Sequence, residues 1–367
     1  MTNRLQSVLN KDNFTKEDLM FLLELQGKDE QALFKKAAEV KAAYVGKVIW
    51  FRGLIEYSNI CSKNCYYCGI RSGNQHAKRY ELTDEEVLTA AKFAIEQNFG
   101  SLVLQAGERS NRKFTAHITS ILKKIKNLSS PGLGITLSMG EQSKNVFREW
   151  YDAGAHRYLL RIESSNPDLY HKLHPNNDTH SFEKRLEALG LLKKLNYQTG
   201  TGVMIGTPFQ TTEHLANDLL FMRDCDIDMC GMGPYIEHKE TPLYIHRHKL
   251  LPLKERFRLS LKMIAVLRIM MKDINIAAST AMQAIDPIGR EKAILAGANV
   301  IMPNITPGTY RDNYDLYENK PRTTENATDT REYLIPNIEL TGDKIGYGDW
   351  GDPKHYFTRK KQHAKNQ

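Results

Sequence analysis

The feature of this sequence that most constrains its fold is a regular alternation of two kinds of segment between residues 48 and 303. Short runs rich in β-branched and apolar residues end in polar or glycine-containing loops, and each is followed by a stretch with helical periodicity. The runs predict strands at 48–58, 101–107, 134–140, 157–164, 198–206, 228–236, 274–280 and 298–303. The stretches predict helices at 83–98, 114–128, 142–152, 181–195, 212–223, 253–271 and 288–296, with a short extra helix at 167–173.

Eight strands that alternate with helices predict an α/β fold with a parallel sheet. This number of strands favours closure into a (β/α)8 TIM barrel, and an open doubly wound sheet is the alternative. We place the barrel at residues 46–310. Residues 1–45 predict an N-terminal helical extension. Residues 311–367 are irregular and rich in Gly, Asp, Asn and Pro, which predicts a C-terminal wrap over one barrel end and a disordered tail.

Composition and charge indicate in which compartment the protein works and which classes of partner it binds. The chain has no apolar run of about 18 residues, and its polar first residues lack the features of a signal peptide. We therefore expect a cytoplasmic protein that does not bind a membrane. The net charge of +8 is read as a solvated surface that can attract an anionic substrate or an acidic partner. No basic stripe is interleaved with aromatic residues, so no nucleic-acid binding is expected.

Three of the five cysteines lie in the stretch NICSKNCYYCGIRSG, at Cys61, Cys65 and Cys68. Their C-x3-C-x2-C spacing follows the first predicted strand, at the mouth where active sites of this fold lie. Structural zinc needs four ligands, and no fourth cysteine is close. Cys225 and Cys230 are read as small core residues.

Three thiolates suit a [4Fe–4S] cluster with one iron left open for a chelating ligand. S-adenosylmethionine (SAM) is such a ligand, and the reduced cluster cleaves it to a 5′-deoxyadenosyl radical. Tyr67, directly before the third cysteine, fits a residue that shields the cluster and touches the adenine. The loop is similar to the signature of the radical SAM superfamily.

Longer stretches of the sequence resemble one particular family within this superfamily. From about residue 45 to 350 the chain resembles the HydE-type [FeFe]-hydrogenase maturases, related to biotin synthase and methylornithine synthase. The stretches that carry this are IEYSNICSKNCYYCGIRSGN, LVLQAGE, ITLSMGE, RYLLRIESSNPDLYHKLHP, TGVMIGTPFQT, GMGPYIEHKETPL and ANVIMPNITPGTYR. The family assembles the hydrogenase active site, the H-cluster. The resemblance implies a radical that attacks the cysteine sulfur of a small iron–CO–cyanide–cysteine precursor.

The resemblance also implies site residues. Cys61, Cys65 and Cys68 would hold the metal cluster, Glu108 would receive the SAM amino group and Arg185 its carboxylate. The remaining expected contacts with SAM or substrate are Tyr67, Gln105, Gly107, Thr136, Ser138, Arg161, Glu163, Met204, Thr280, Met302, Tyr310 and Arg311.

Some of these residues have a simpler reading. Arg161 and Glu163 can form a buried ion pair that only fixes packing. Met302 can be a core residue and Arg311 a surface residue. His171 and His174 are three apart on the short helix, but no carboxylate completes a metal site.

The chain departs from some relatives because no cysteine follows Cys230, so we expect one cluster and no second one. Ala106 stands where relatives have serine, which weakens any hydroxyl contact there. Two alternative functions remain: a paralogue that acts on an amino acid, or an iron–sulfur carrier without radical chemistry. Expected partners are a ferredoxin- or flavodoxin-type electron donor, other hydrogenase maturases and a small substrate.

Overall fold

A computed structural model describes residues 2–130, 132–321 and 326–365. Its centre is a ring of parallel strands, as the sequence predicts. The ring runs in order through β1 (Val48–Ser58), β2 (Ser101–Ala106), β3 (Gly134–Ser138), β4 (Ala155–Leu159), β5 (Gln198–Thr201), β7 (Met229–Cys230), β9 (Asn275–Ile276) and β10 (Val300–Ile301). β10 pairs with β1, and a bridge from Ala277 to Val300 joins β9 to β10, so the ring closes. The (β/α)8 barrel prediction is therefore confirmed.

Two additions lie at the ends of the ring. Beyond β5 and β7 the chain forms β6 (Met204–Ile205) and β8 (Gly233–Pro234), which pair with each other above the main sheet. The long strands predicted at 198–206 and 228–236 are thus each split in two. At the opposite end, β11 (Lys344–Gly346) pairs with the start of β1.

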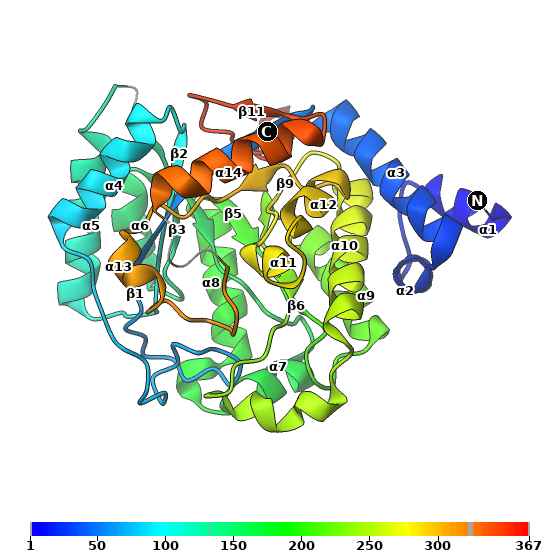
Figure 1. Cartoon of the computed structure of the whole chain (residues 1–367), viewed down its shortest axis with the longest axis horizontal. Helices are drawn as coiled ribbons and strands as arrows, with labels where there is room; N and C mark the ends of the chain where they lie inside the picture. The colour runs from blue at the N-terminus through cyan, green and yellow to red at the C-terminus, as the bar shows by residue number, and fades with distance from the viewer. Residues whose placement is uncertain (1, 131, 322–325, 366–367) are drawn as a thin grey trace.

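Helices cover the outside of the ring (Figure 1). They are α4 (Asp84–Glu96), α5 (Arg112–Lys126), α6 (Lys144–Asp152), α7 (Pro167–Leu173), α8 (Phe182–Lys194), α9 (Thr212–Asp224), α10 (Leu253–Met270), α11 (Thr280–Ile285) and α12 (Gly289–Leu295). The caps explain where many of them begin, because a side-chain oxygen accepts a first-turn N–H at Thr83, Asn111, Ser143, Ser181 and Thr211. Short 3₁₀ helices, η1 (Asp178–His180) and η2 (Pro242–Lys249), lie in the loops.

The N-terminal segment is helical, as expected: α1 (Asn3–Leu9), α2 (Lys16–Glu24) and α3 (Gly27–Tyr44). α3 packs on α10, and α2 packs on α9 and α10, which places all three at one side of the barrel (Figure 1). None of the described helices combines the length and the apolar character that crossing a bilayer requires.

The C-terminal segment is more regular than predicted. It contains α14 (Ala327–Leu340) after the short α13 (Gly308–Arg311), followed by α15 (Lys354–Lys365). The prediction of a disordered tail is therefore wrong for residues up to 365, and residues 366–367 lie outside the described residues. α15 is held by charge: His355 contacts Asp226 and Asp273 at 2.6 and 2.8 Å, and Arg359 contacts Asp228 at 2.8 Å. These partners lie in distant parts of the chain, so local sequence does not reveal them.

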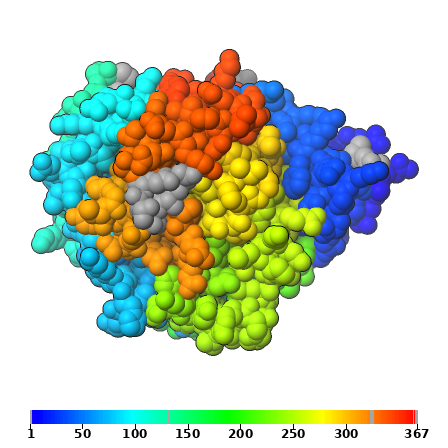
Figure 2. Space-filling view, viewed as in Figure 1, coloured from blue at the N-terminus to red at the C-terminus, as the bar shows by residue number. Residues whose placement is uncertain are grey.

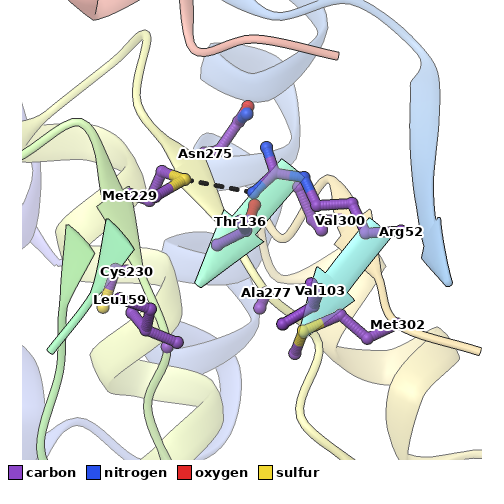
Figure 3. A pocket seen from close by; sticks show the side chains of 11 residues that line it. Arg52, Val103, Thr136, Leu159, Met229, Cys230, Asn275, Ala277, Val300 and Met302 are labelled. Carbon is purple, nitrogen blue, oxygen red and sulfur yellow. Dashed lines mark hydrogen bonds between the residues drawn. The ribbon is translucent and has the colours of Figure 1, made fainter. Parts of the chain in front are cut away.

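The loop between β11 and α15 closes the amino-terminal end of the ring. Fully buried Arg157 donates to the carbonyl of Trp350 and to the carboxylate of Asp352, and Arg52 donates to the carbonyl of Gly351. Next to these groups lies a small cavity of about 30 Å³, lined by Arg52 and by ring residues such as Val103 and Val300. Figure 3 shows Arg52 reaching toward Met229, with their Nη1 and Sδ atoms 3.1 Å apart. The base of the barrel is therefore filled, and the open space lies at the other end.

Candidate functional site

A cavity of about 330 Å³ opens at the carboxyl ends of the strands. This is the end where barrel enzymes of this architecture carry their active sites. The cavity brings together most of the residues that the sequence singled out: Cys61, Cys65, Tyr67, Cys68, Gln105, Gly107, Glu108, Ser138, Arg161, Glu163, Arg185, Met204, Thr280 and Met302.

The cysteine loop is fixed by hydrogen bonds to its backbone. Arg79 alone donates to four carbonyls of the loop, those of Asn59, Ile70, Arg71 and Asn74, at 2.7–3.1 Å. The loop also approaches the end of β2 closely: a Cβ added at Gly107 would lie 2.5 Å from the carbonyl oxygen of Ile60. Gly107 therefore serves the placement of the loop.

The three thiols line the cavity in a buried setting. Burial raises the pKa of all three, that of Cys65 to about 12, with Cys61 as the second cause for Cys65. The Glu108 N–H points at the Cys61 sulfur at 3.3 Å. Buried thiols of this kind become thiolates when a metal centre supplies positive charge.

The number of thiols in the cavity distinguishes between kinds of metal centre. Among the described residues, no three His, Cys, Asp or Glu side chains converge as ligands of one metal ion. A mononuclear zinc site needs all donors within about 2.3 Å of a single ion. Three thiols are one donor short of a four-cysteine zinc site, whereas a cubic cluster gives each of three thiolates an iron of its own, so this donor set fits a [4Fe–4S] group.

Next to the cysteines lies a buried network of two acids and two bases. Glu108 is 3.2 Å from Lys63 and 4.0 Å from Arg185, and Glu141 is 3.1 Å from Lys63 and 2.5 Å from Arg185. Burial raises the pKa of Glu108 against the opposing effect of Arg185 and Lys63. Burial disfavours the charge on Arg185, yet Glu141 and Glu108 raise its pKa well above the usual value. The network places charges of both signs beside the thiols, as a zwitterionic ligand requires.

Arg161 and Glu163 lie beyond the end of β4 and both face the cavity. Their side chains form an ion pair of 3.0 Å, and Arg161 also donates to the Val203 carbonyl at 2.9 Å. Burial raises the pKa of Glu163 although Arg161 and Arg185 favour its charge. The Glu163 backbone has φ +66°, a conformation that L-residues adopt rarely and that costs about 1–3 kcal/mol. Such strain is typical of functional sites.

The turn after Glu163 is held from behind by α9. Buried Asp218 accepts hydrogen bonds from both the N–H and the hydroxyl of Ser165, each at 2.6 Å. Burial raises the pKa of Asp218 to about 6.

Tyr67 is positioned by a histidine that the sequence analysis examined only as a metal ligand. The Tyr67 hydroxyl lies 3.3 Å from Nε2 of His174, whose Nδ1 lies 2.9 Å from the Tyr170 carbonyl. Burial lowers the pKa of His174 well below its usual value, so the ring is neutral. A neutral ring that donates through Nδ1 accepts at Nε2, which fits the Tyr67 hydroxyl as donor.

Three expected site residues do not line this cavity. Thr136 faces the barrel base, where its hydroxyl accepts from Arg157 at 2.9 Å. Tyr310 stacks on Tyr80 outside the cavity and donates to Glu86 at 2.9 Å. Arg311 is neither in the cavity nor on the surface: it is fully buried and donates to the carbonyls of Thr306 and Asn304 and the hydroxyl of Thr330. The placement of these three residues therefore differs from the expected contact with SAM or substrate.

Several polar residues of the cavity were not among the expected site residues. Lys63 lies between the first two cysteines, and that position was an available signal. Glu56 is on the lumen side of β1, and it pairs at 2.6 Å with Lys320 from the segment before α14. Tyr314 and Tyr317 reach the cavity from that same segment. Their distance along the chain hides this contact from local reading.

The chain is similar to known proteins over most of its length. The model of the Radical SAM superfamily matches residues 55–222. The "[FeFe] hydrogenase maturase subunit HydE" of Thermotoga maritima is 44% identical over 350 residues, covering 95% of this chain and 97% of that protein. The biotin synthase of Macrococcus caseolyticus is 26% identical over 226 residues, 61% of this chain and 67% of that protein.

Two solved structures share the architecture. Methylornithine synthase (PylB) superposes with a TM-score of 0.79 at 25% identity, over 94% of this chain and 98% of that chain. HydG, described as a maturase of the [FeFe]-hydrogenase, gives a TM-score of 0.77 at 20% identity, over 94% of this chain and 75% of that chain.

Proposed function

This chain belongs to the HydE family of radical SAM enzymes, and from this premise we propose that it acts in assembling the active site of an [FeFe]-hydrogenase. The 44% identity to the Thermotoga maritima HydE over nearly the full length of both chains carries the proposal. In detail, SAM is reductively cleaved to a 5′-deoxyadenosyl radical, which attacks the cysteine sulfur of a small iron–CO–cyanide–cysteine precursor. Other hydrogenase maturases supply that precursor or receive the product.

Each group of cavity residues has a task under this proposal. Cys61, Cys65 and Cys68 would hold a [4Fe–4S] cluster, which with bound SAM supplies the adenosyl radical. The bases Lys63 and Arg185 attract the carboxylate of SAM, and Glu108 accepts hydrogen bonds from its ammonium group. Glu141 lies outside the cavity lining and holds Lys63 and Arg185 in place. Because these four charges already neutralise each other, a zwitterion can enter without leaving a net buried charge.

Further along the cavity, Glu163 offers a carboxylate to ribose hydroxyls, and its strained backbone holds that carboxylate in one orientation. The Tyr67 ring, oriented by His174, provides an aromatic face next to the thiols. The substrate end then has Ser279, Thr280, Met302 and the Glu56–Lys320 pair. Apolar side chains such as Leu54, Met232 and Ile236 line the same cavity.

One observation favours a second candidate, an amino-acid substrate. The superposition on methylornithine synthase covers 94% of this chain, and the Glu56–Lys320 pair offers both charges that an amino acid needs. The buried charge network beside the cysteines speaks against the third alternative, because a cluster carrier without radical chemistry does not require such a network.

Anaerobic reconstitution separates the candidates. Reconstituted protein is incubated with dithionite, SAM and either the iron–CO–cyanide–cysteine complex or free amino acids. The proposal predicts 5′-deoxyadenosine and a new EPR signal with the iron complex only. Consumption of an amino acid would instead favour the paralogue, and no 5′-deoxyadenosine with any substrate would favour the carrier. Cys65→Ala should abolish cleavage, whereas Cys225→Ala, outside the cavity, should not.

A further inference from the structure

We propose that a basic and apolar surface beside the cysteine loop is the docking site for an acidic one-electron carrier protein. This surface, the rim patch, consists of Lys172, Phe209, Ile245, Arg247, Lys249 and Leu251. The inference rests on the proposed function, because reductive SAM cleavage needs an electron that no group of this chain provides.

The charge of the rim patch is one-sided. Between Thr241 and Lys254 the chain has three lysines or arginines, two histidines and no acidic residue. Of the acids on neighbouring segments, Glu213 pairs with Lys16 at 2.6 Å and Glu237 with Arg256 at 2.7 Å. Asp168, Glu240 and Glu255 also border the patch. In the part of the chain that the structure describes, no carboxylate forms an ion pair with the lysines or the arginine of the patch. The positive electrostatic field of the rim patch therefore extends into the solvent, where a partner protein approaches.

Apolar groups are exposed within the same surface. Ile245 is 67% exposed and Leu251 46% exposed, although both are large aliphatic side chains. The Phe209 ring lies under the ammonium groups of both Lys172 and Lys249, at 5.3 and 4.8 Å. Exposed aliphatic groups ringed by cations are the composition of a protein contact rather than of a solvated face.

The rim patch is joined directly to the metal-binding loop. The Leu243 N–H of η2 donates to the Tyr66 carbonyl, and the Tyr66 N–H donates to the carbonyl of Leu173 in α7. Tyr66 directly follows Cys65 and packs in one apolar cluster with Leu243 and Phe209. At the lower edge of Figure 2, the yellow-green η2 region lies on the same side as the blue cysteine loop. A protein bound on η2 is therefore connected to Cys65 by the backbone hydrogen bond between Leu243 and Tyr66 and by the peptide bond between Tyr66 and Cys65.

Charge complementarity selects the occupant. A carrier with acidic residues around its redox centre matches the cations, and its rim contacts would steer encounter and orientation. In the docked complex the carrier is oxidised by one electron, which passes to the group held by Cys61, Cys65 and Cys68. No bond is formed or broken in this step, and the cleavage of SAM follows it.

The test uses the full-length reconstituted protein with an acidic bacterial flavodoxin as the probe. The variant is Arg247→Glu/Lys249→Glu, and the matched control is Lys28→Glu/Lys35→Glu, which changes net charge equally on exposed positions of α3. The first readout is the flavodoxin Kd at low and high salt. The second is 5′-deoxyadenosine formation driven by reduced flavodoxin or by dithionite.

The rim patch is supported if the variant raises the flavodoxin Kd about tenfold and removes its salt dependence, while the control changes it less than about twofold. Dithionite-driven cleavage should be equal in all three proteins, which also shows that the variant folds. Equal effects of variant and control, or a wild type that binds anionic phosphatidylglycerol vesicles but not flavodoxin, would overturn the inference. If flavodoxin binds as expected but no protein cleaves SAM with dithionite, the proposed function fails and the docking site stands.

Discussion

The hydroxyl of Tyr67 lies 3.3 Å from Nε2 of His174, and the two rings meet edge to face with centroids 5.3 Å apart. The histidine comes from the end of α7, more than a hundred residues beyond the cysteine loop in sequence. It is not a metal ligand here but a support for the aromatic residue that flanks the third cysteine.

Loss of this support should weaken SAM binding without loss of the cluster. A neutral hydrogen bond contributes about 1 kcal/mol, so we expect His174→Ala to raise the SAM Kd about fivefold. His171→Ala, on the same short helix, should leave the Kd unchanged. Iron content and SAM titration of reconstituted protein measure both. A fall in iron content would show instead that His174 holds the loop itself.

Asp218 should make the protein less stable as pH rises. Its pKa is raised to about 6 in the folded state, so the folded protein binds a proton that the unfolded chain releases from about pH 4. Stability from this group is full below pH 4 and declines as pH rises through 6, by about 3 kcal/mol in total.

The Asp218→Asn variant removes this titration. The difference in unfolding free energy between wild type and variant should change between pH 4 and pH 7, in favour of the variant at the higher pH. Denaturant unfolding at a series of pH values measures it. A difference that stays constant across this range would contradict the expected protonation of Asp218.

His355 should stabilise the docking of α15 at neutral pH. Burial opposes its charge, but hydrogen bonds to Asp226 and Asp273 raise its pKa to about 9. The stabilisation is complete below about pH 6.5 and is lost as pH rises through 9, and with allowance for partial exposure it amounts to about 2 kcal/mol. His355→Gln should thus lower stability at pH 7, and the gap to wild type should close by about pH 10. Thermal unfolding across this range, with proteolysis of α15 as a local probe, tests this.

The Glu56–Lys320 pair should show strong coupling. Both side chains are buried, and their charged atoms are 2.6 Å apart. Lys320→Met leaves the Glu56 carboxylate buried and unpaired, which we expect to cost about 3–5 kcal/mol of stability. The double variant Glu56→Gln/Lys320→Met should recover most of that loss. If the two single changes simply add in a double-mutant cycle, the two groups are not a coupled pair.

The parts of the fold that repeat locally were predictable from the sequence. Each strand–helix unit carries its own signals, such as the capping box of Thr83 and Glu86 and the proline at the start of α7. α14 also has a capping box, Asn326 with Asp329, but the segment lacks a clear apolar face and has Pro336 inside the helix. α15 is held by ion pairs to residues more than 80 positions away, which no local pattern shows.

The candidate site likewise contains residues that local sequence predicts and residues that distant packing places. The cysteines and the residues at the ends of β2, β3 and β4 were predictable, because the carboxyl ends of parallel strands meet at one mouth. Tyr310 and Arg311 lie just beyond the last strand, and the chain turns away from the cavity there into α13. Four residues later the same segment returns and presents Tyr314, Tyr317 and Lys320 to the cavity. The direction of such a turn depends on packing against distant elements.

The loop that fills the base of the barrel has a consequence for synthesis. Arg52 and Arg157 receive their carbonyl and carboxylate partners from Trp350, Gly351 and Asp352, which the ribosome adds about 300 residues after Arg52. A nascent chain that stops short of this loop leaves Arg157 in the barrel interior without its carboxylate partner, and it leaves Arg52 and Arg157 without their carbonyl partners. Truncation before residue 350 is therefore expected to destabilise the barrel itself and not only its C-terminal segment.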